Sequence, residues 1–292
     1  METISLDKFI EKNDLQKPLS NDFKILKDNF SFFKNHEYNE EISDYNFERA
    51  ILLYGLIEKI QPQNSLEIGT STGYGTLSMV SALKKTNSKI FTIDIIGSET
   101  KINNYFLLKN TLKSNVTTRN ELWKKFCKKD WFEKIIFLNG YSSEIFSTFL
   151  FPSIDFFYID GAHFYDAFKF DFFSCLKLSN SKSYFLCDDY IERTDYGVKK
   201  FIDESLEPII KTTLIKTDAS QFYLKNKITN KDYGMCFFEI DKSQMQKYFS
   251  ERELIHFTKK YLKFEKRYKL RKNINKKIPF LKNIRFKNFL SN

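Results

Sequence analysis

The feature that most constrains this chain is a series of short apolar runs separated by segments with helical spacing. Near-continuous apolar runs of this length are typical of strands buried on both faces of a parallel sheet. Their alternation with helical segments is the pattern of α/β folds, so we expect a doubly wound, mostly parallel sheet. The five runs cover residues 65–68, 89–95, 134–138, 154–159 and 183–187.

Helices are expected between these runs, and two later runs should complete the sheet. The later runs, 209–215 and 234–240 with 221–224 between them, predict an antiparallel pair and a total of seven strands. We expect three parts: a helical N-terminal cap over 1–62, a central domain over 63–242 and a basic C-terminal extension over 243–292. The expected helices cover residues 76–85, 103–113, 121–128, 142–150, 165–178 and 198–206.

The formal charge of +10 comes from one end of the chain. Residues 259–292 hold 13 of the 47 Lys and Arg but only one of the 37 Asp and Glu, so residues 1–258 carry a net charge of −2. A near-neutral body does not predict a nucleic-acid-binding domain. The extension could bind an anionic membrane surface or RNA, or pack as an ordinary helix; nucleic acid is the less favoured partner.

Several classes of protein are disfavoured by what the sequence lacks. The four cysteines contain no C-x-x-C pair, which argues against a zinc ribbon and a disulfide framework. The first residues have neither a basic nor an apolar segment typical of a signal peptide, and no apolar run approaches the ~20 residues that span a bilayer. We expect a cytoplasmic protein, with peripheral attachment at the membrane as an option.

A glycine turn follows the first run and opens directly into a helical segment. It reads Glu67-Ile-Gly69-Thr70-Ser-Thr-Gly73-Tyr-Gly75. Small residues let backbone approach a ligand closely, and a helix N-terminus offers free N–H groups. The spacing does not fit the G-x-G-x-x-G of nicotinamide dinucleotide sites. The next run ends at Asp94, a carboxylate placed where it can accept both hydroxyls of a ribose.

This combination resembles the class I S-adenosylmethionine-dependent methyltransferases, whose fold is Rossmann-like. The resemblance places Glu67 and Gly69 near the methionine part of the cofactor and Asp94 near its ribose. The turn at 139–142 falls where the family reads the adenine. The cofactor contacts implied in this way are Glu67, Gly69, Thr70, Gly73, Gly75, Asp94, Ser142 and Asp160.

Three carboxylates follow the fourth and fifth runs. Asp160 ends one run, and Asp188 and Asp189 end the next. Neighbouring parallel strands lie ~4.8 Å apart, so these side chains should converge. A cluster of like charges is costly unless something neutralises it, and a hard divalent cation such as Mg²⁺ would do so. An Asp-Asp pair can also be a solvated turn or a helix cap.

These residues sharpen the resemblance to the methyltransferases that include macrocin O-methyltransferase and, more loosely, to catechol-type enzymes. That resemblance implies that Asp160, Asp188 and Asp189 are metal ligands and that His163, in Asp-Gly-Ala-His, is a general base; Asp160 is then also part of the catalytic set. A lone histidine after a strand can equally be structural. The Asn/Asp-Pro-Pro-Tyr motif of base N-methyltransferases is missing, because this place reads Asp160-Gly-Ala-His163.

The sequence therefore predicts an S-adenosylmethionine-dependent, Mg²⁺-assisted O-methyltransferase for a hydroxyl of a sugar or other small polyol. Vicinal oxygens would chelate the cation, which favours a diol acceptor, as a small molecule or part of a glycan. We expect the acceptor to be chosen by the N-terminal helices and residues 191–196. The alternative is a non-catalytic binding module that keeps the fold and attaches to RNA or membrane through its tail.

Overall fold

The structure is a computed structural model of the whole chain. It describes residues 1–18, 21–30, 33–35, 41–43, 46–109, 111–192, 196–217 and 234–277. Two expectations fall on residues outside this description. They are the apolar run 221–224 and residues 193–195 of the segment expected to select the acceptor.

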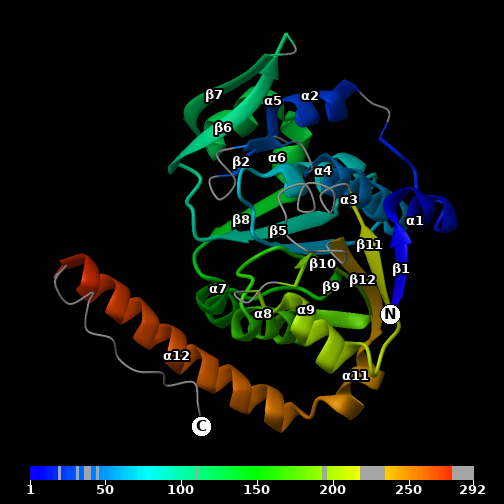
Figure 1. Cartoon of the computed structure of the whole chain (residues 1–292), viewed down its shortest axis with the longest axis vertical. Helices are drawn as coiled ribbons and strands as arrows, with labels where there is room; N and C mark the ends of the chain where they lie inside the picture. Colours follow the sequence, from blue (N-terminus) through cyan, green and yellow to red (C-terminus); the bar gives the residue numbers. More distant parts are fainter. Residues whose placement is uncertain are drawn as a thin grey trace. The chain divides into compact units, whose positions relative to one another are not determined.

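The described chain alternates strands and helices through its central part (Figure 1). The strands are β1 (Glu2–Ser5), β2 (Phe33–Asn35), β3 (Glu41–Ser43), β4 (Asn64–Ile68), β5 (Lys89–Asp94), β6 (Lys101–Leu108), β7 (Thr111–Thr118), β8 (Ile135–Asn139), β9 (Ile154–Ile159), β10 (Ser179–Tyr190), β11 (Thr212–Lys216) and β12 (Gly234–Asp241). The helices are α1 (Leu6–Lys12), α2 (Asn21–Phe30), α3 (Asn46–Ile60), α4 (Tyr74–Ala82), α5 (Arg119–Phe126), α6 (Lys129–Lys134), α7 (Ser142–Thr148), α8 (Tyr165–Leu178), α9 (Val198–Phe201) with the π-helical turn η2 (Ile202–Leu206), α11 (Lys242–Tyr248) and α12 (Glu251–Lys277).

The central sheet confirms the doubly wound, mostly parallel architecture. Its order is β1-β11-β12-β10-β9-β4-β5-β8. Strands β8, β5, β4, β9 and β10 run parallel, and β12 is antiparallel to both β10 and β11. All seven expected strands are present. An eighth, β1, pairs in parallel with β11 at the edge.

Two expectations about local structure were wrong. Residues 103–113 do not form a helix; they belong to an antiparallel hairpin of β6 and β7. Lys109 at the turn has a positive φ of 50°, which suits a tight hairpin connection rather than a helix. Residues 1–62 are not wholly helical either, because they contain β1 and the pair β2–β3.

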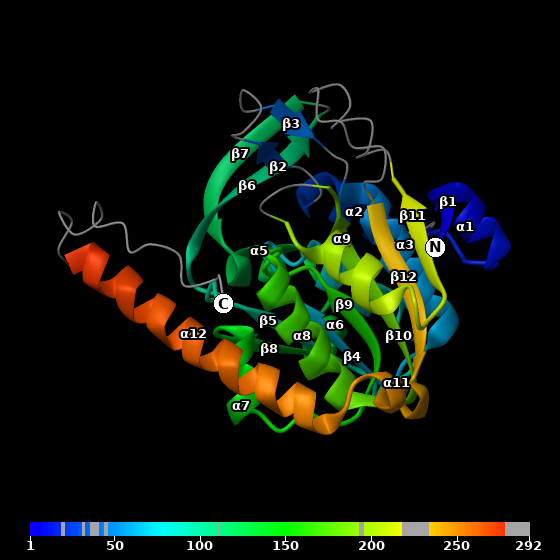
Figure 2. The same ribbon diagram turned by 60° about the horizontal axis from the view of Figure 1, so that its bottom comes forward.

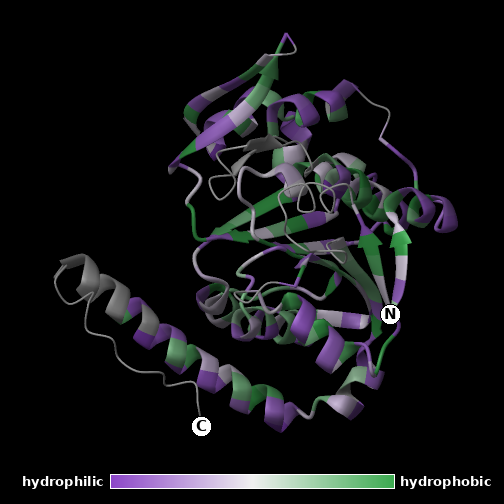
Figure 3. Ribbon diagram, in the orientation of Figure 1, coloured by the Kyte–Doolittle hydropathy of each residue, from purple (hydrophilic) through white to green (hydrophobic). Residues whose placement is uncertain are grey.

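Helices cover both faces of the sheet, so its central strands are enclosed. Figures 1 and 2 show α3, α4 and α6 on one face and α7, α8 and α9 on the other. The central strands are correspondingly apolar (Figure 3), with Leu66, Ile90 and Phe157 fully buried. This burial fixes the carboxyl ends of β4, β5, β9 and β10 at one edge, where the glycine turn and the carboxylates lie.

The chain forms two compact units, Met1–Tyr248 and Phe249–Asn292. The second unit contains α12, a single helix that mixes hydrophilic and hydrophobic residues along its length (Figure 3). Within the described residues, no helix is long and apolar enough to cross a membrane. Cys127, Cys175, Cys187 and Cys236 are all free thiols in the structure.

Candidate active site

Glu67 is a buried carboxylate at the end of β4, only 1% exposed. One oxygen, Oε2, accepts hydrogen bonds from the hydroxyls of Thr76 and Thr92, the latter at 2.5 Å. The other oxygen, Oε1, is buried and has no hydrogen-bond partner. Burial raises the pKa of Glu67 to about 7, against the lowering effect of the two threonines. A donor from a ligand would satisfy Oε1.

Glycines in the turn make room for these groups. A Cβ on Gly75 would overlap Glu67 Oε1, and one on Gly69 would overlap the Asp160 carbonyl. Gly69 and Gly73 also have φ near +100°, a region that disfavours other residues. At Gly73 the neighbour is Trp123 of α5, whose indole Nε1 donates to the Thr72 carbonyl at 2.9 Å.

The Thr70 side chain contacts the neighbouring strand β5. Its hydroxyl lies 2.5 Å from that of Thr92, and Thr70 is buried. Thr70 therefore fixes the turn to β5, the strand that ends at Asp94.

Asp94 lies beside the glycine turn, as the sequence predicts. Its oxygens accept from the backbone N–H of Ser71 at 2.6 Å and of Ile96 at 2.7 Å. The guanidinium of Arg119 is also near, with Nη2 3.3 Å from Asp94 Oδ2. Sequence reasoning did not identify Arg119, which begins α5 after the β6–β7 hairpin.

The turn expected to read adenine borders Asp94. Gly140 N–H and Asn139 Nδ2 each donate to the Asp94 carbonyl at 2.9 Å. Ser142 begins α7 immediately after this turn and is half-buried. Its position is compatible with the expected adenine contact, which stays a prediction.

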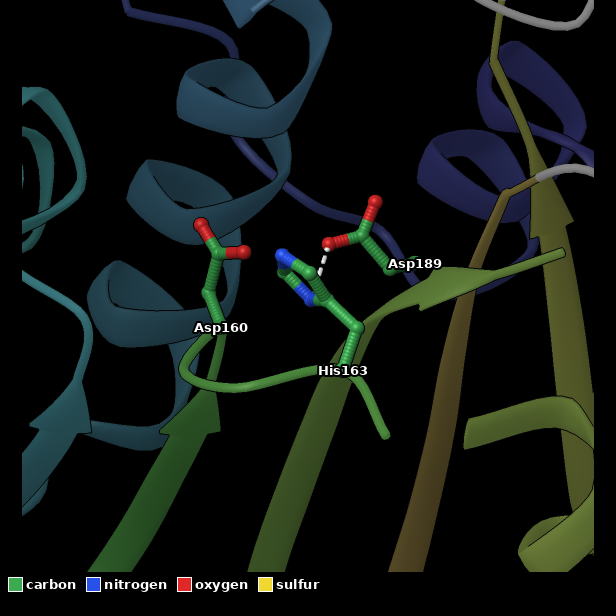
Figure 4. Close-up of side chains that lie close together, drawn as sticks. All are labelled: Asp160, His163 and Asp189. Atoms are coloured by element: carbon green, nitrogen blue, oxygen red, sulfur yellow. Dashed lines mark ion pairs between the residues drawn. The ribbon is translucent and has the colours of Figure 1, made fainter. Parts of the chain in front are cut away.

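Asp160, His163 and Asp189 converge beyond β9 and β10 (Figure 4). Their ligand atoms all lie within 4.8 Å of one another. His163 Nδ1 is 2.8 Å from Asp189 Oδ2, and Tyr196 stacks on the imidazole with ring centroids 4.6 Å apart. Two contacts therefore hold the ring orientation of His163.

Local backbone strain aims Asp189 into this cluster. Its φ is +55°, and the β10–β12 pairing is irregular between Cys187 and Tyr190. A positive φ is costly for a non-glycine residue and is concentrated at functional sites. Such irregularities commonly re-aim a side chain next to an active site.

Asp188 is not one of these three residues and has other partners. Arg49 Nε is 2.5 Å from Asp188 Oδ2, and the Tyr158 hydroxyl is 2.9 Å from the same oxygen. Arg49 Nη2 also lies 3.9 Å from Asp189 Oδ1. Among the described residues, the group with metal-ligand spacing contains His163 in place of the expected Asp188. Arg49 already neutralises part of the charge that suggested a cation.

The electrostatics of the cluster are strongly perturbed. Burial raises the pKa of Asp160 well above its usual range, and the charges of Asp188 and Asp189 add to this. Burial alone lowers the pKa of His163, but the hydrogen bond and charge of Asp189, with Asp160 and Asp188, raise it to about 9. Perturbed groups gathered in one place are typical of catalytic sites.

The sequence did not indicate Arg49 or Tyr158 as site residues, for different reasons. Arg49 lies on α3, far from the cluster in sequence, with no motif around it. Tyr158 alternates with apolar residues in β9 and reads as core, yet its hydroxyl also lies 3.1 Å from Asp160 Oδ2. The alternation of strand residues could have shown that Tyr158 and Asp160 share a face of the sheet.

Known proteins resemble this chain in sequence and fold. Residues 66–190 match a family described as "Methyltransferase domain". The O-methyltransferase TomG of Streptomyces achromogenes, solved with S-adenosylmethionine, is 15% identical with a TM-score of 0.50, over 80% of this chain and 96% of that one. An O-methyltransferase from Bacillus cereus, solved with S-adenosylhomocysteine, is 16% identical with a TM-score of 0.50, over 81% and 96%. No curated protein matches the chain.

The family match covers β4 to β10, the segment that carries Glu67, the glycine turn, Asp94 and the carboxylate cluster. The narrower resemblance to macrocin O-methyltransferase stays a prediction. Residues 66–190 therefore match a methyltransferase domain, and the fold is the one found in these two O-methyltransferases.

Proposed function

We propose that this chain transfers methyl from S-adenosylmethionine to a hydroxyl of a sugar or other small polyol, with a divalent cation, preferably Mg²⁺, at the acceptor. The observation that carries this proposal is the trio of Asp160, His163 and Asp189 at the sheet edge that also carries Glu67 and Asp94. TomG and the B. cereus protein are O-methyltransferases, which agrees with an oxygen acceptor.

The cofactor side of the site fits S-adenosylmethionine. Glu67 Oε1 is a buried acceptor without a partner, suited to the ammonium of the methionine part. Gly69 and Gly75 let the Asp160 carbonyl and Glu67 Oε1 come close to the turn, because a Cβ on either glycine would overlap them. Asp94 is nine-tenths buried beside the turn and is suited to the ribose.

The acceptor side provides a base in a fixed orientation. S-adenosylmethionine supplies an electrophilic methyl, and the hydroxyl must lose its proton as the oxygen–carbon bond forms. Asp189 occupies Nδ1 of His163, so the proton would be held at Nε2. Asp189 and the stacked Tyr196 keep the ring from rotating, which is the role of an orienting group in an acid–base pair.

The donor set at this site also fits a divalent cation. Asp160 and Asp189 offer carboxylate oxygens, the ligands that suit Mg²⁺ and Mn²⁺, within 4.8 Å of each other. A bound cation would lower the pKa of an acceptor hydroxyl and orient it. Because the imidazole lies in the same cluster, His163 could contact the cation or its bound acceptor.

The test is titration of S-adenosylmethionine by calorimetry with and without Mg²⁺, repeated for Asp189→Ala and His163→Ala. We expect all three proteins to bind the cofactor. In the wild type the heat of binding should differ with and without Mg²⁺, and Asp189→Ala should abolish this difference. Failure of the wild type to bind the cofactor at any Mg²⁺ concentration would leave only the non-catalytic binding module. Equal methyl transfer in EDTA would remove the cation and leave the transferase.

Helix α12 has the character of an attachment surface for an anionic membrane. Six exposed bases fall on one face at helical spacing, over about 22 Å at 1.5 Å per residue. A flat anionic surface can contact such a face along its whole length, with ~1 kcal/mol for each base. The six bases are Arg252, Lys259, Lys260, Lys263, Lys266 and Arg267.

Changing Lys259, Lys263 and Lys266 together to Gln should reduce binding to phosphatidylserine-containing vesicles by at least tenfold at low salt, measured by co-sedimentation. A matched triple variant of exposed lysines in the first unit, Lys84, Lys200 and Lys211 to Gln, should bind as the wild type does. Binding to RNA but not to these vesicles would show that the anionic partner is nucleic acid.

A further inference from the structure

Arg119 is a buried cation at the edge of the cofactor site. It begins α5 and is only 1% exposed. Its Nε donates to the Ser71 carbonyl at 2.6 Å, and its Nη1 donates to the Ile96 carbonyl at 3.1 Å. The guanidinium also lies over the Phe137 ring, 4.6 Å from the centroid. These contacts fix the plane of the guanidinium between the glycine turn and the end of β5.

The third nitrogen, Nη2, has no hydrogen-bond partner although it is buried. It lies 3.3 Å from Asp94 Oδ2, close enough for charge attraction. A buried N–H without an acceptor is costly, so its persistence here points to an acceptor supplied by a ligand. Burying an arginine that forms an ion pair with one carboxylate, Asp94, is also expensive for folding, which gives the arrangement a functional character.

Asp94, which lies beside Nη2, has acceptor capacity left. A carboxylate offers about four acceptor sites, and the N–H groups of Ser71 and Ile96 use two. A hydroxyl both donates one hydrogen bond and accepts others. The pair of Asp94 and Arg119 Nη2 therefore complements both roles of one hydroxyl.

On the basis of the proposed function, we infer that Arg119 is a second ribose-binding residue. Its Nη2 donates a hydrogen bond to one ribose hydroxyl of the cofactor, and the same hydroxyl donates a hydrogen bond to Asp94. The cofactor then satisfies the unpartnered N–H. The β6–β7 hairpin leads directly into α5, where Thr118 caps the helix by accepting from Glu121 N–H, so the hairpin and the capped helix position this cofactor contact.

The experiment measures ribose selectivity in wild type and Arg119→Met. The probes are S-adenosylhomocysteine and its 2′-deoxy and 3′-deoxy analogues, titrated by calorimetry. A hydrogen bond to a charged donor predicts that wild type binds one deoxy analogue roughly 10- to 100-fold more weakly. In Arg119→Met this preference should shrink about tenfold. A preference equal to that of wild type would overturn the inference.

Two controls separate this inference from a loss of structure and from the proposed function. Phe137→Leu removes the ring below the guanidinium and should weaken all three ligands by the same factor, leaving the preference intact. If Arg119→Met does not fold, Arg119→Lys, which keeps the charge without the planar fork, should show the reduced preference. Equal binding of all three ligands by wild type overturns the role of Arg119, whereas no binding of S-adenosylhomocysteine overturns the proposed function itself.

Discussion

Replacement of Glu67 by Gln should weaken S-adenosylmethionine binding and stabilise the cofactor-free fold. Loss of a charge-assisted hydrogen bond to the methionine ammonium should cost about 1.5–3 kcal/mol, a loss of roughly 10- to 100-fold in affinity. The affinity of wild type should rise with pH up to about 7, because Glu67 must lose its proton to bind the ammonium as a carboxylate. Calorimetry in two buffers of different ionisation enthalpy measures that proton release.

The stability effect follows from the direction of the pKa shift. The pKa of Glu67 rises from 4.5 in the unfolded chain to about 7 in the fold. Between these values the folded state keeps a proton that the unfolded state has lost, so stability falls as pH rises through this window. At ~1.4 kcal/mol per pKa unit the penalty approaches about 3 kcal/mol above pH 7.

Glu67→Gln removes this penalty, and the variant should therefore unfold at a higher denaturant concentration than wild type at pH 8 but not at pH 4. Glu58→Gln is the matched control, because Glu58 forms an ion pair with Lys84 away from the cofactor site. This substitution should change the free energy of unfolding by no more than about 0.5 kcal/mol and should leave cofactor affinity unchanged. A Glu67→Gln variant that is less stable than wild type at pH 8 would contradict the assignment of Glu67 as a buried carboxylate with a raised pKa.

The second large effect is expected at His163. His163→Ala should lower kcat by about 10²- to 10⁴-fold, the range for loss of a general base, while S-adenosylmethionine affinity stays within about twofold. Asp189→Asn should lower kcat less, because it keeps the hydrogen-bonding shape but removes the charge that stabilises protonated His163. Single-turnover methyl transfer separates the chemical step from binding.

The pH dependence gives an independent check on the same residue. The proton on His163 must leave before it can act as a base, so kcat/KM of wild type should rise with pH towards about 9. Saturating Mg²⁺ should move this rise to lower pH, because a cation beside Asp160 and Asp189 opposes the positive imidazolium. The rise should be missing in His163→Ala. A pH profile that is identical in the variant would exclude His163 as the base.

Folding stability should also fall as pH rises through the titration of His163, although here the charged form is the one that stabilises the fold. The pKa of His163 is raised from 6.5 to about 9, so the contribution of its ion pair with Asp189 is fully present below pH 6.5. This contribution is lost as pH rises through about 9. His163→Ala should therefore destabilise the protein most in acid, where Glu67→Gln has no stabilising effect.

Much of the fold could be predicted from local pattern. The β4 to β10 core follows from apolar runs that can only be buried between two helical layers, and α8 was predicted with its observed bounds, Tyr165–Leu178. The β6–β7 hairpin could not be recognised from the same kind of pattern. Its strands alternate weakly, and α2 and β2 pack beside β6, so long-range contacts decide against the helix.

The sequence by itself determined the doubly wound sheet, the glycine turn and the placing of Glu67, Asp94, Asp160 and Asp189 at strand ends, because these depend on periodicity and on position along a strand. Only the tertiary structure decided which groups meet there. Arg49 on α3 forms an ion pair with Asp188, His163 lies beside Asp160 and Asp189, and Arg119 at the start of α5 forms an ion pair with Asp94. Charge balance in a buried site is set by side chains that are distant in sequence, and no local spacing records those contacts.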